Sequence, residues 1–258
     1  MVNILSLDWD YFIDVTEEQR ATMFPETGTE EIDLKTQAII WMARYASNPQ
    51  LQNVSIIENQ IEALTDIIYD YSKENTKFFV AESHKEISDI LLECKKADED
   101  IYLYNVDFHH DCFNTSKEEI AHGDWIKIVI NETGDKEIHC GNWLRHFRNI
   151  GIINEATWIK RNDSEEPPAG IIDRILSDVK QLDNYLADGI DYIFFCRSGM
   201  WTPPHLDNEF VSAVYALADL IGFQDPVGID EMYYRWTDTF QKEIKKLKES
   251  LGIVLKIS

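Results

Sequence analysis

The sequence lacks the features that mark several other classes of protein. It has four cysteines and no Cys-x-x-Cys pair, which argues against a structural zinc knuckle or a disulfide framework. No apolar run approaches the roughly 20 residues that a membrane span requires. The first residues also lack the basic and apolar regions of an export signal. We therefore expect a cytoplasmic protein without a membrane partner.

Basic residues are scarce as well. The 258 residues include 24 of Lys and Arg against 47 of Asp and Glu, which leaves a formal net charge of −23. This charge opposes binding to nucleic acid and favours cationic ligands or metal ions. Solubility alone would also explain this charge. The net charge therefore supports a cationic ligand or metal ion only if the sequence also contains a binding site for one. The length fits one large domain, predicted to span residues 1–258.

Short β-rich runs alternate with longer helical patterns along the chain. The pattern predicts strands at Val2–Leu7, Lys77–Ala81, Ile101–Val106, Trp125–Ile130 and Tyr192–Cys196. It predicts helices at Ile32–Tyr45, Asn59–Tyr71, Glu86–Lys95, Ile171–Leu186, Asn208–Leu220 and Thr237–Leu251. Alternation at this spacing indicates crossover units, so we predict an α/β fold with a mostly parallel sheet in a three-layer α/β/α arrangement.

Two of the predicted strands end in an alternating pattern of acids and histidine. Asp8 and Asp10 follow the first strand, and Asp107, His109 and Asp111 follow the third. Residues two apart point to one side while a chain stays extended, so each set is expected to converge. An Asp-x-Asp pair alone fits a turn or a helix cap equally well. The Asp-x-His-x-Asp segment is more specific, because three such groups need a counter-charge when buried and a divalent metal supplies it.

A further histidine follows the second predicted strand. His84 comes after Ser83, and Glu86 lies three residues beyond Ser83, as in a capping box at the start of a helix. A cap at Ser83 and a ligand role for His84 are compatible. His110 has the opposite parity to its neighbours, which favours a supporting or packing role.

The candidate ligands together comprise four carboxylates, two imidazoles and no thiolate. This set favours manganese over structural zinc, with iron or a pair of zinc ions as alternatives. Six ligands are enough for two ions that share carboxylates, and such a pair activates water for hydrolysis. The set is Asp8, Asp10, His84, Asp107, His109 and Asp111.

These motifs resemble the metal-binding motifs of the arginase and deacetylase superfamily. The resemblance rests on the Asp-x-His-x-Asp segment, on the upstream His84 and on Ser-Leu-Asp-Trp-Asp at residues 6–10. In arginases the Asp-x-Asp strand lies C-terminal to the other two motifs, whereas here it opens the chain. The order is thus circularly permuted, which leaves the site achievable if the strands are neighbours in the sheet.

Three segments are similar to a branch of this superfamily that includes peptide arginases, which convert arginine side chains in a peptide to ornithine and release urea. They are Leu-Asp-Trp-Asp-Tyr-Phe, Val-Asp-Phe-His-His-Asp and the Gly-Asn-Trp of residues 141–143. The resemblance implies a binuclear manganese hydrolase that acts on a cationic, arginine-containing peptide. The alternatives are a one-metal deacetylase of the same fold and a non-catalytic peptide-binding scaffold.

The resemblance also implies roles outside the metal ligands. His139 is the counterpart of the arginase proton shuttle, with His122 and His146 as rivals. No acid follows the strand at residues 192–196 where the family places the glutamate that holds the guanidinium. Glu82, on a different strand, is a candidate for this anion, and Trp201 is a candidate for stacking on the substrate guanidinium. Each of these residues also has a structural alternative. Glu82 fits a capping acid, Trp201 fits a ring packed under a Pro-Pro turn, and His139 fits a histidine at the end of a strand.

Overall fold

A six-stranded sheet organises the part of the protein that the structure describes. The computed structural model describes residues 1–25, 33–113, 138–223 and 235–257. All strand pairs are parallel, in the order β2-β6-β1-β3-β4-β5. The strands are β1 (Val2–Asp8), β2 (Ser72–Ala81), β3 (Ile101–Val106), β4 (Ile153–Ile159), β5 (Arg174–Leu176) and β6 (Ile190–Cys196).

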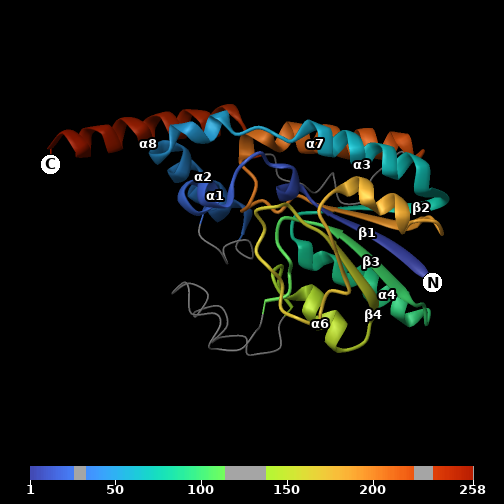
Figure 1. Ribbon diagram of the computed structural model, residues 1–258. Helices are drawn as coiled ribbons and strands as arrows, with labels where there is room; N and C mark the ends of the chain where they lie inside the picture. The colour runs from blue at the N-terminus through green and yellow to red at the C-terminus, as the bar shows by residue number, and fades with distance from the viewer. Residues whose placement is uncertain (26–32, 114–137, 224–234, 258) are drawn as a thin grey trace.

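Helices cover both faces of this sheet, which confirms the three-layer α/β/α prediction (Figure 1). One layer holds α1 (Glu17–Met23), α2 (Leu34–Ser47), α3 (Glu58–Tyr71), α7 (Asp207–Leu220) and α8 (Asp238–Ile257). The other holds α4 (Ile87–Lys96) and α6 (Trp143–Asn149). Short 3-10 turns are η1 (Trp9–Phe12), η2 (Pro49–Asn53), η3 (His84–Glu86), η4 (Val179–Asn184) and η5 (Pro204–Leu206).

The central strand β1 shows why two apolar layers form. Its side chains alternate between the faces, so Leu5 and Leu7 pack in the core under α2, α3 and α7. Val2 and Ile4 pack in the core under α4 and α6. A strand buried on both sides carries apolar residues on both faces, and β1 was recognisable from the sequence because most of its residues are apolar. Among the described residues, no helix is both long and apolar enough to cross a membrane.

Most predicted elements are confirmed, but the helix at Ile171–Leu186 is wrong. This region instead forms β5 and η4, and β4 before it was not predicted. Asp173 explains the difference, because its backbone N–H donates to the carbonyl of Ala156 at 2.9 Å and its side chain accepts from the N–H of Ala156 at 2.8 Å. These bonds hold the chain extended beside β4. The predicted strand at Trp125–Ile130 lies outside the described residues.

The carboxyl ends of four strands lie at one level of the sheet. Asp8 pairs with Cys196, Ala81 pairs with the same Cys196, and Leu7 pairs with Val106. The motifs that follow β1, β2 and β3 therefore leave the same edge. The strands are not all neighbours, however: β6 lies between β1 and β2, so the residues after β6 also border this edge.

Candidate metal centre

Asp8 and Asp10 approach the site from a turn and not from an extended strand. Asp8 ends β1, and its Oδ1 accepts a hydrogen bond of 3.0 Å from the backbone N–H of Asp10. Asp8 is thus the N-cap of η1, so the cap interpretation of the Asp-x-Asp pair is confirmed. The expectation of an extended segment through Asp10 is wrong, because the cap bond bends the chain after Asp8. The second carboxylate oxygen of Asp8 remains directed into the cluster.

The Asp-x-His-x-Asp segment is bent as well. Oδ1 of Asp107 accepts from the backbone N–H of His109 at 2.8 Å, and Asp111 has a left-handed φ of 50°. The extended geometry expected beyond Val106 is therefore wrong. The bends separate the three side chains, so that Asp107 and Asp111 reach His84 whereas His109 reaches Asp10.

The capping box that precedes α4 is confirmed, with Ser83 as its N-cap and Glu86 as its third helical residue. Glu86 accepts from the backbone N–H of Ser83 at 3.0 Å, and this turn places His84 over the strand ends.

Three carboxylates converge on one nitrogen of His84. Its Nδ1 lies 3.1 Å from Oδ2 of Asp8, 3.2 Å from Oδ2 of Asp107 and 3.1 Å from Oδ2 of Asp111. The ring is fixed in this orientation because its Nε2 makes a 2.7 Å hydrogen bond with Oγ of Ser6. A ring nitrogen carries at most one hydrogen, so it cannot bond all three oxygens at once. A cation among these four atoms would satisfy all of them.

A second group lies beside the first. Nδ1 of His109 is 2.8 Å from Oδ2 of Asp10, and Asp107 lies within reach of both. Two sets of ligand atoms, Asp8–His84–Asp107 and Asp10–Asp107–His109, each fall within 4.8 Å. Asp107 belongs to both sets. The side chain of His109 is 24% exposed whereas that of Asp10 is 0% exposed, so the second group lies closer to solvent.

The charges of this cluster conflict with its burial. Burial first, and then the neighbouring charges of Asp10 and Asp107, raise the pKa of Asp8 to about 7. Burial and the charge of Asp111 raise the pKa of Asp107 to about 7. Burial would also raise the pKa of Asp10, but the contact with His109 outweighs it and lowers that pKa to about 2. Hard oxygen and imidazole donors that concentrate four buried carboxylates in one place suit a divalent ion, so the residues fit the expected metal.

Hydrogen bonds from three neighbouring segments orient the carboxylates. Ser198 Oγ donates to Oδ2 of Asp8 at 2.5 Å, Trp143 Nε1 donates to Oδ2 of Asp111 at 2.5 Å, and Asn105 Nδ2 donates to Oδ2 of Asp107 at 3.3 Å. Such supporting contacts fix the direction of metal ligands. A supporting role for these residues, or for Ser6, was not predicted from the sequence. A polar residue on a buried strand or directly after one is the signal that could have found them.

Replacing Ser198 by Ala is expected to weaken metal binding by roughly tenfold, because loss of a supporting hydrogen bond frees the Asp8 carboxylate. Isothermal titration of the metal-stripped protein with Mn²⁺ measures this. Ser47→Ala, on the exposed side of α2, removes a hydroxyl remote from the cluster and should leave the affinity unchanged. Equal affinities for the two variants would contradict the role of Ser198.

The candidate proton shuttle lies in the turn before α6. The backbone N–H of His139 donates to Oδ1 of Asn142 at 2.8 Å, and its Nδ1 accepts from the N–H of Gly141 at 3.2 Å. Trp143 follows in the same turn and bonds Asp111, which places His139 on a segment that contacts the cluster. The ring of His146 packs against Phe147, with centroids 5.3 Å apart. His122 lies outside the described residues, and the role of His139 stays a prediction.

The two expected substrate residues have different surroundings. Oε2 of Glu82 accepts a hydrogen bond from Nε of Arg197 at 2.8 Å and lies 2.5 Å from Nη2 of the same arginine. This carboxylate therefore has a buried cationic partner within the protein. The ring of Trp201 lies beside that of His109, with centroids 4.5 Å apart, and is half-buried. Trp201 therefore lies at the more exposed side of the cluster, where a ligand would approach.

His110 has the packing role expected from its parity. Its Nδ1 accepts from the backbone N–H of Cys112 at 2.9 Å, and its ring lies 4.6 Å from that of Phe113. Burial lowers its pKa to about 4, so it stays neutral.

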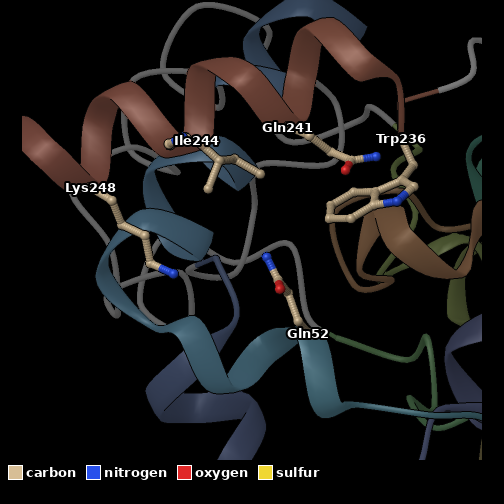
Figure 2. Close-up of a pocket in the computed structure, with 6 residues that line it drawn as sticks. Gln52, Trp236, Gln241, Ile244 and Lys248 are labelled. Atoms are coloured by element: carbon tan, nitrogen blue, oxygen red, sulfur yellow. The ribbon is translucent and has the colours of Figure 1, made fainter.

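Two hollows that the described residues form elsewhere on the surface lack the paired acid and imidazole groups of the cluster. Figure 2 shows one of about 220 Å³ between η2 and α8, where Trp236 and Lys248 point toward Gln52. Its lining contains no carboxylate or imidazole among the described residues. The acid and imidazole chemistry is therefore at the strand ends.

The fold and this cluster define an α/β protein with a buried carboxylate–imidazole centre. No family model matches the chain, and no curated protein or solved structure matches it either.

Proposed function

We propose that this protein is a binuclear manganese-dependent hydrolase that opens a guanidino group. Its proposed substrate is an arginine residue in a peptide, which becomes ornithine as urea is released. The observation that carries this proposal is the position of Asp107, which belongs to two adjacent sets of ligand atoms. A carboxylate that belongs to two adjacent sets of ligands can bind both ions of a two-metal centre.

The cluster divides into two ion positions. The His84 position comprises Asp8, His84, Asp107 and Asp111, and the His109 position comprises Asp10, Asp107 and His109. When bound, a pair of divalent ions activates water for attack on an electrophilic carbon. Manganese fits a set dominated by carboxylates, and Fe²⁺ or Zn²⁺ are the alternatives.

The protein's own residues would bind and orient the substrate at the His109 side. Trp201 offers a ring face to a guanidinium next to His109. His139 is the proposed donor of a proton to the leaving amine. Glu82 would have to share its carboxylate with Arg197 to bind a substrate guanidinium, so Trp201 has the stronger support. The net charge of −23 favours the approach of a cationic peptide at low salt.

A one-metal deacetylase of the same fold is the second candidate function. It would need one ion alone, and Asp10 would then be dispensable. The 2.8 Å contact of Asp10 with His109, next to Asp107, favours two ions. A non-catalytic scaffold is less well supported, because burying four carboxylates around two imidazoles costs free energy that a bound cation would offset.

Mass spectrometry of peptides incubated with Mn²⁺-loaded protein tests the proposal. An arginine-containing peptide should lose the mass of one CH₂N₂ unit per converted residue, and urea should appear in equal amount. The same peptide with lysine in place of arginine is the matched control and should stay intact. Loss of an acetyl group from an acetyl-lysine peptide, with no change to arginine peptides or free arginine, would instead support the deacetylase. No reaction with any of them would overturn the proposed hydrolase.

A further inference from the structure

A buried arginine lies against the His109 position. Arg20 is 3% exposed and comes from α1, whose first turn is fixed by a capping box between Thr16 and Gln19. Its Nη2 donates to the backbone carbonyl of Asp10 at 2.5 Å, and its Nη1 lies 3.7 Å from Oδ2 of Asp10. This carboxylate oxygen is the same one that contacts His109.

The guanidinium is held rigidly but is only partly paired. Its central carbon lies 3.9 Å from the ring centroid of Phe108, which fixes the plane of the group. Nε and Nη1 of Arg20 have no hydrogen-bond partner among the described residues. The acids of Glu17 and Asp163 also act on Arg20, but more weakly than Asp10, and the positive charge of Arg161 acts in the opposite direction. The positive charge of Arg20 is therefore directed mainly at Asp10.

Among the described residues, no arginine or lysine makes an ion pair with the carboxylates of the His84 position. The ion pairs that the described residues make with Asp8, Asp107 and Asp111 all come from His84. The two positions thus differ in charge as well as in ligands. One offers three carboxylates without a fixed counter-charge, whereas the other offers a carboxylate that already faces a guanidinium.

We infer that Arg20 is a fixed counter-charge to Asp10 that weakens ion binding at the His109 position, so that the two ions bind in separate steps. The inference rests on the proposed function. A guanidinium and a divalent ion that share one carboxylate oxygen repel each other, and burial limits the screening by water and salt. The ion at the His84 position therefore binds first. Without the second ion, Arg20 holds Asp10 in place.

Titration of the metal-stripped protein with Mn²⁺ by calorimetry tests this inference. The wild-type protein should bind two ions, the second at least tenfold more weakly than the first. Arg20→Met removes the charge and keeps an unbranched apolar stem, so it should tighten the second step at least tenfold and leave the first within about threefold. Arg20→Lys keeps the charge and should preserve the wild-type separation. The two positions also differ in ligand number, which by itself could separate the two binding steps. The comparison of Arg20→Met with Arg20→Lys therefore isolates the effect of charge on the affinity of the second step.

The possible failures are distinguishable. Binding of no ion by the wild-type protein would overturn the proposed function together with this inference. Two ions that bind in a single step would overturn the inference alone. An unchanged second step in Arg20→Met, or equal tightening in Arg20→Lys, would show that the charge of Arg20 does not set the affinity. Thermal unfolding by circular dichroism establishes whether each variant folds. If Arg20→Met does not fold, Arg20→Gln takes its place as the uncharged variant.

Discussion

Replacing Asp107 by Asn should abolish tight binding at both ion positions. Asp107 is the one acid shared by the two sets of ligand atoms, and a neutral amide is a much weaker metal ligand than a carboxylate. Bound manganese, measured by elemental analysis after desalting, should fall from two ions per chain to fewer than one. Turnover of the arginine peptide should fall by roughly a thousandfold or more, because the proposed chemistry depends on both ions.

Two further variants make this result specific. Asp10→Asn alters only the His109 position and should leave about one ion bound, which separates a shared ligand from an unshared one. Asp66→Asn makes the same substitution on the exposed side of α3 and should bind two ions as the wild type does. If Asp107→Asn kept two ions, or lost no more than Asp10→Asn does, Asp107 would not be shared and the binuclear proposal would fail.

The parts of the fold that could be predicted are those in which local pattern and tertiary position agree. β1 and β3 are buried on both faces and consist mostly of apolar residues. β4 has the sequence Ile-Asn-Glu-Ala-Thr-Trp-Ile, whose polar beginning hides the strand. β5 is only three residues long and owes its extended form to hydrogen bonds between Asp173 and Ala156. A contact between residues 17 positions apart is invisible to local periodicity.

The candidate ligands were predictable by type but not by geometry. Their position at the strand ends followed from the general behaviour of parallel sheets. Their division into two sets did not, because it depends on the cap bond of Asp8 and on the left-handed backbone of Asp111. Arg20 and Ser198 were missed for a related reason. They reach the cluster from α1 and from the end of β6, which no spacing along the chain connects to it.

The metal-stripped protein should lose stability as the pH rises from 6 to 8. The pKa of Asp8 and that of Asp107 are raised to about 7 from an unfolded value of 3.8. Between these values the folded chain holds protons that the unfolded chain has released, so each rise in pH favours unfolding. For His109, burial opposes the charged form, but Asp10 outweighs it and raises the pKa from 6.5 to about 9. The stabilising contribution of His109 is complete below about pH 6.5 and is lost toward pH 9.

These groups act in the same direction over this window, whereas the lowered pKa of Asp10, about 2, acts only in acid. Because the groups influence one another, their combined effect on the free energy of unfolding is about 2 kcal/mol, so the melting temperature in EDTA should fall by roughly 4 °C or more.

With Mn²⁺ the stabilisation should instead grow with pH, because protons compete with the ion for the same carboxylates and imidazoles. Scanning calorimetry at both pH values, with and without the ion, measures both effects. Asp8→Asn removes one of the buried charges, so it should flatten the pH dependence in EDTA, whereas Asp66→Asn should not. A melting temperature in EDTA that rises with pH would show that these carboxylates are not held in an uncompensated cluster.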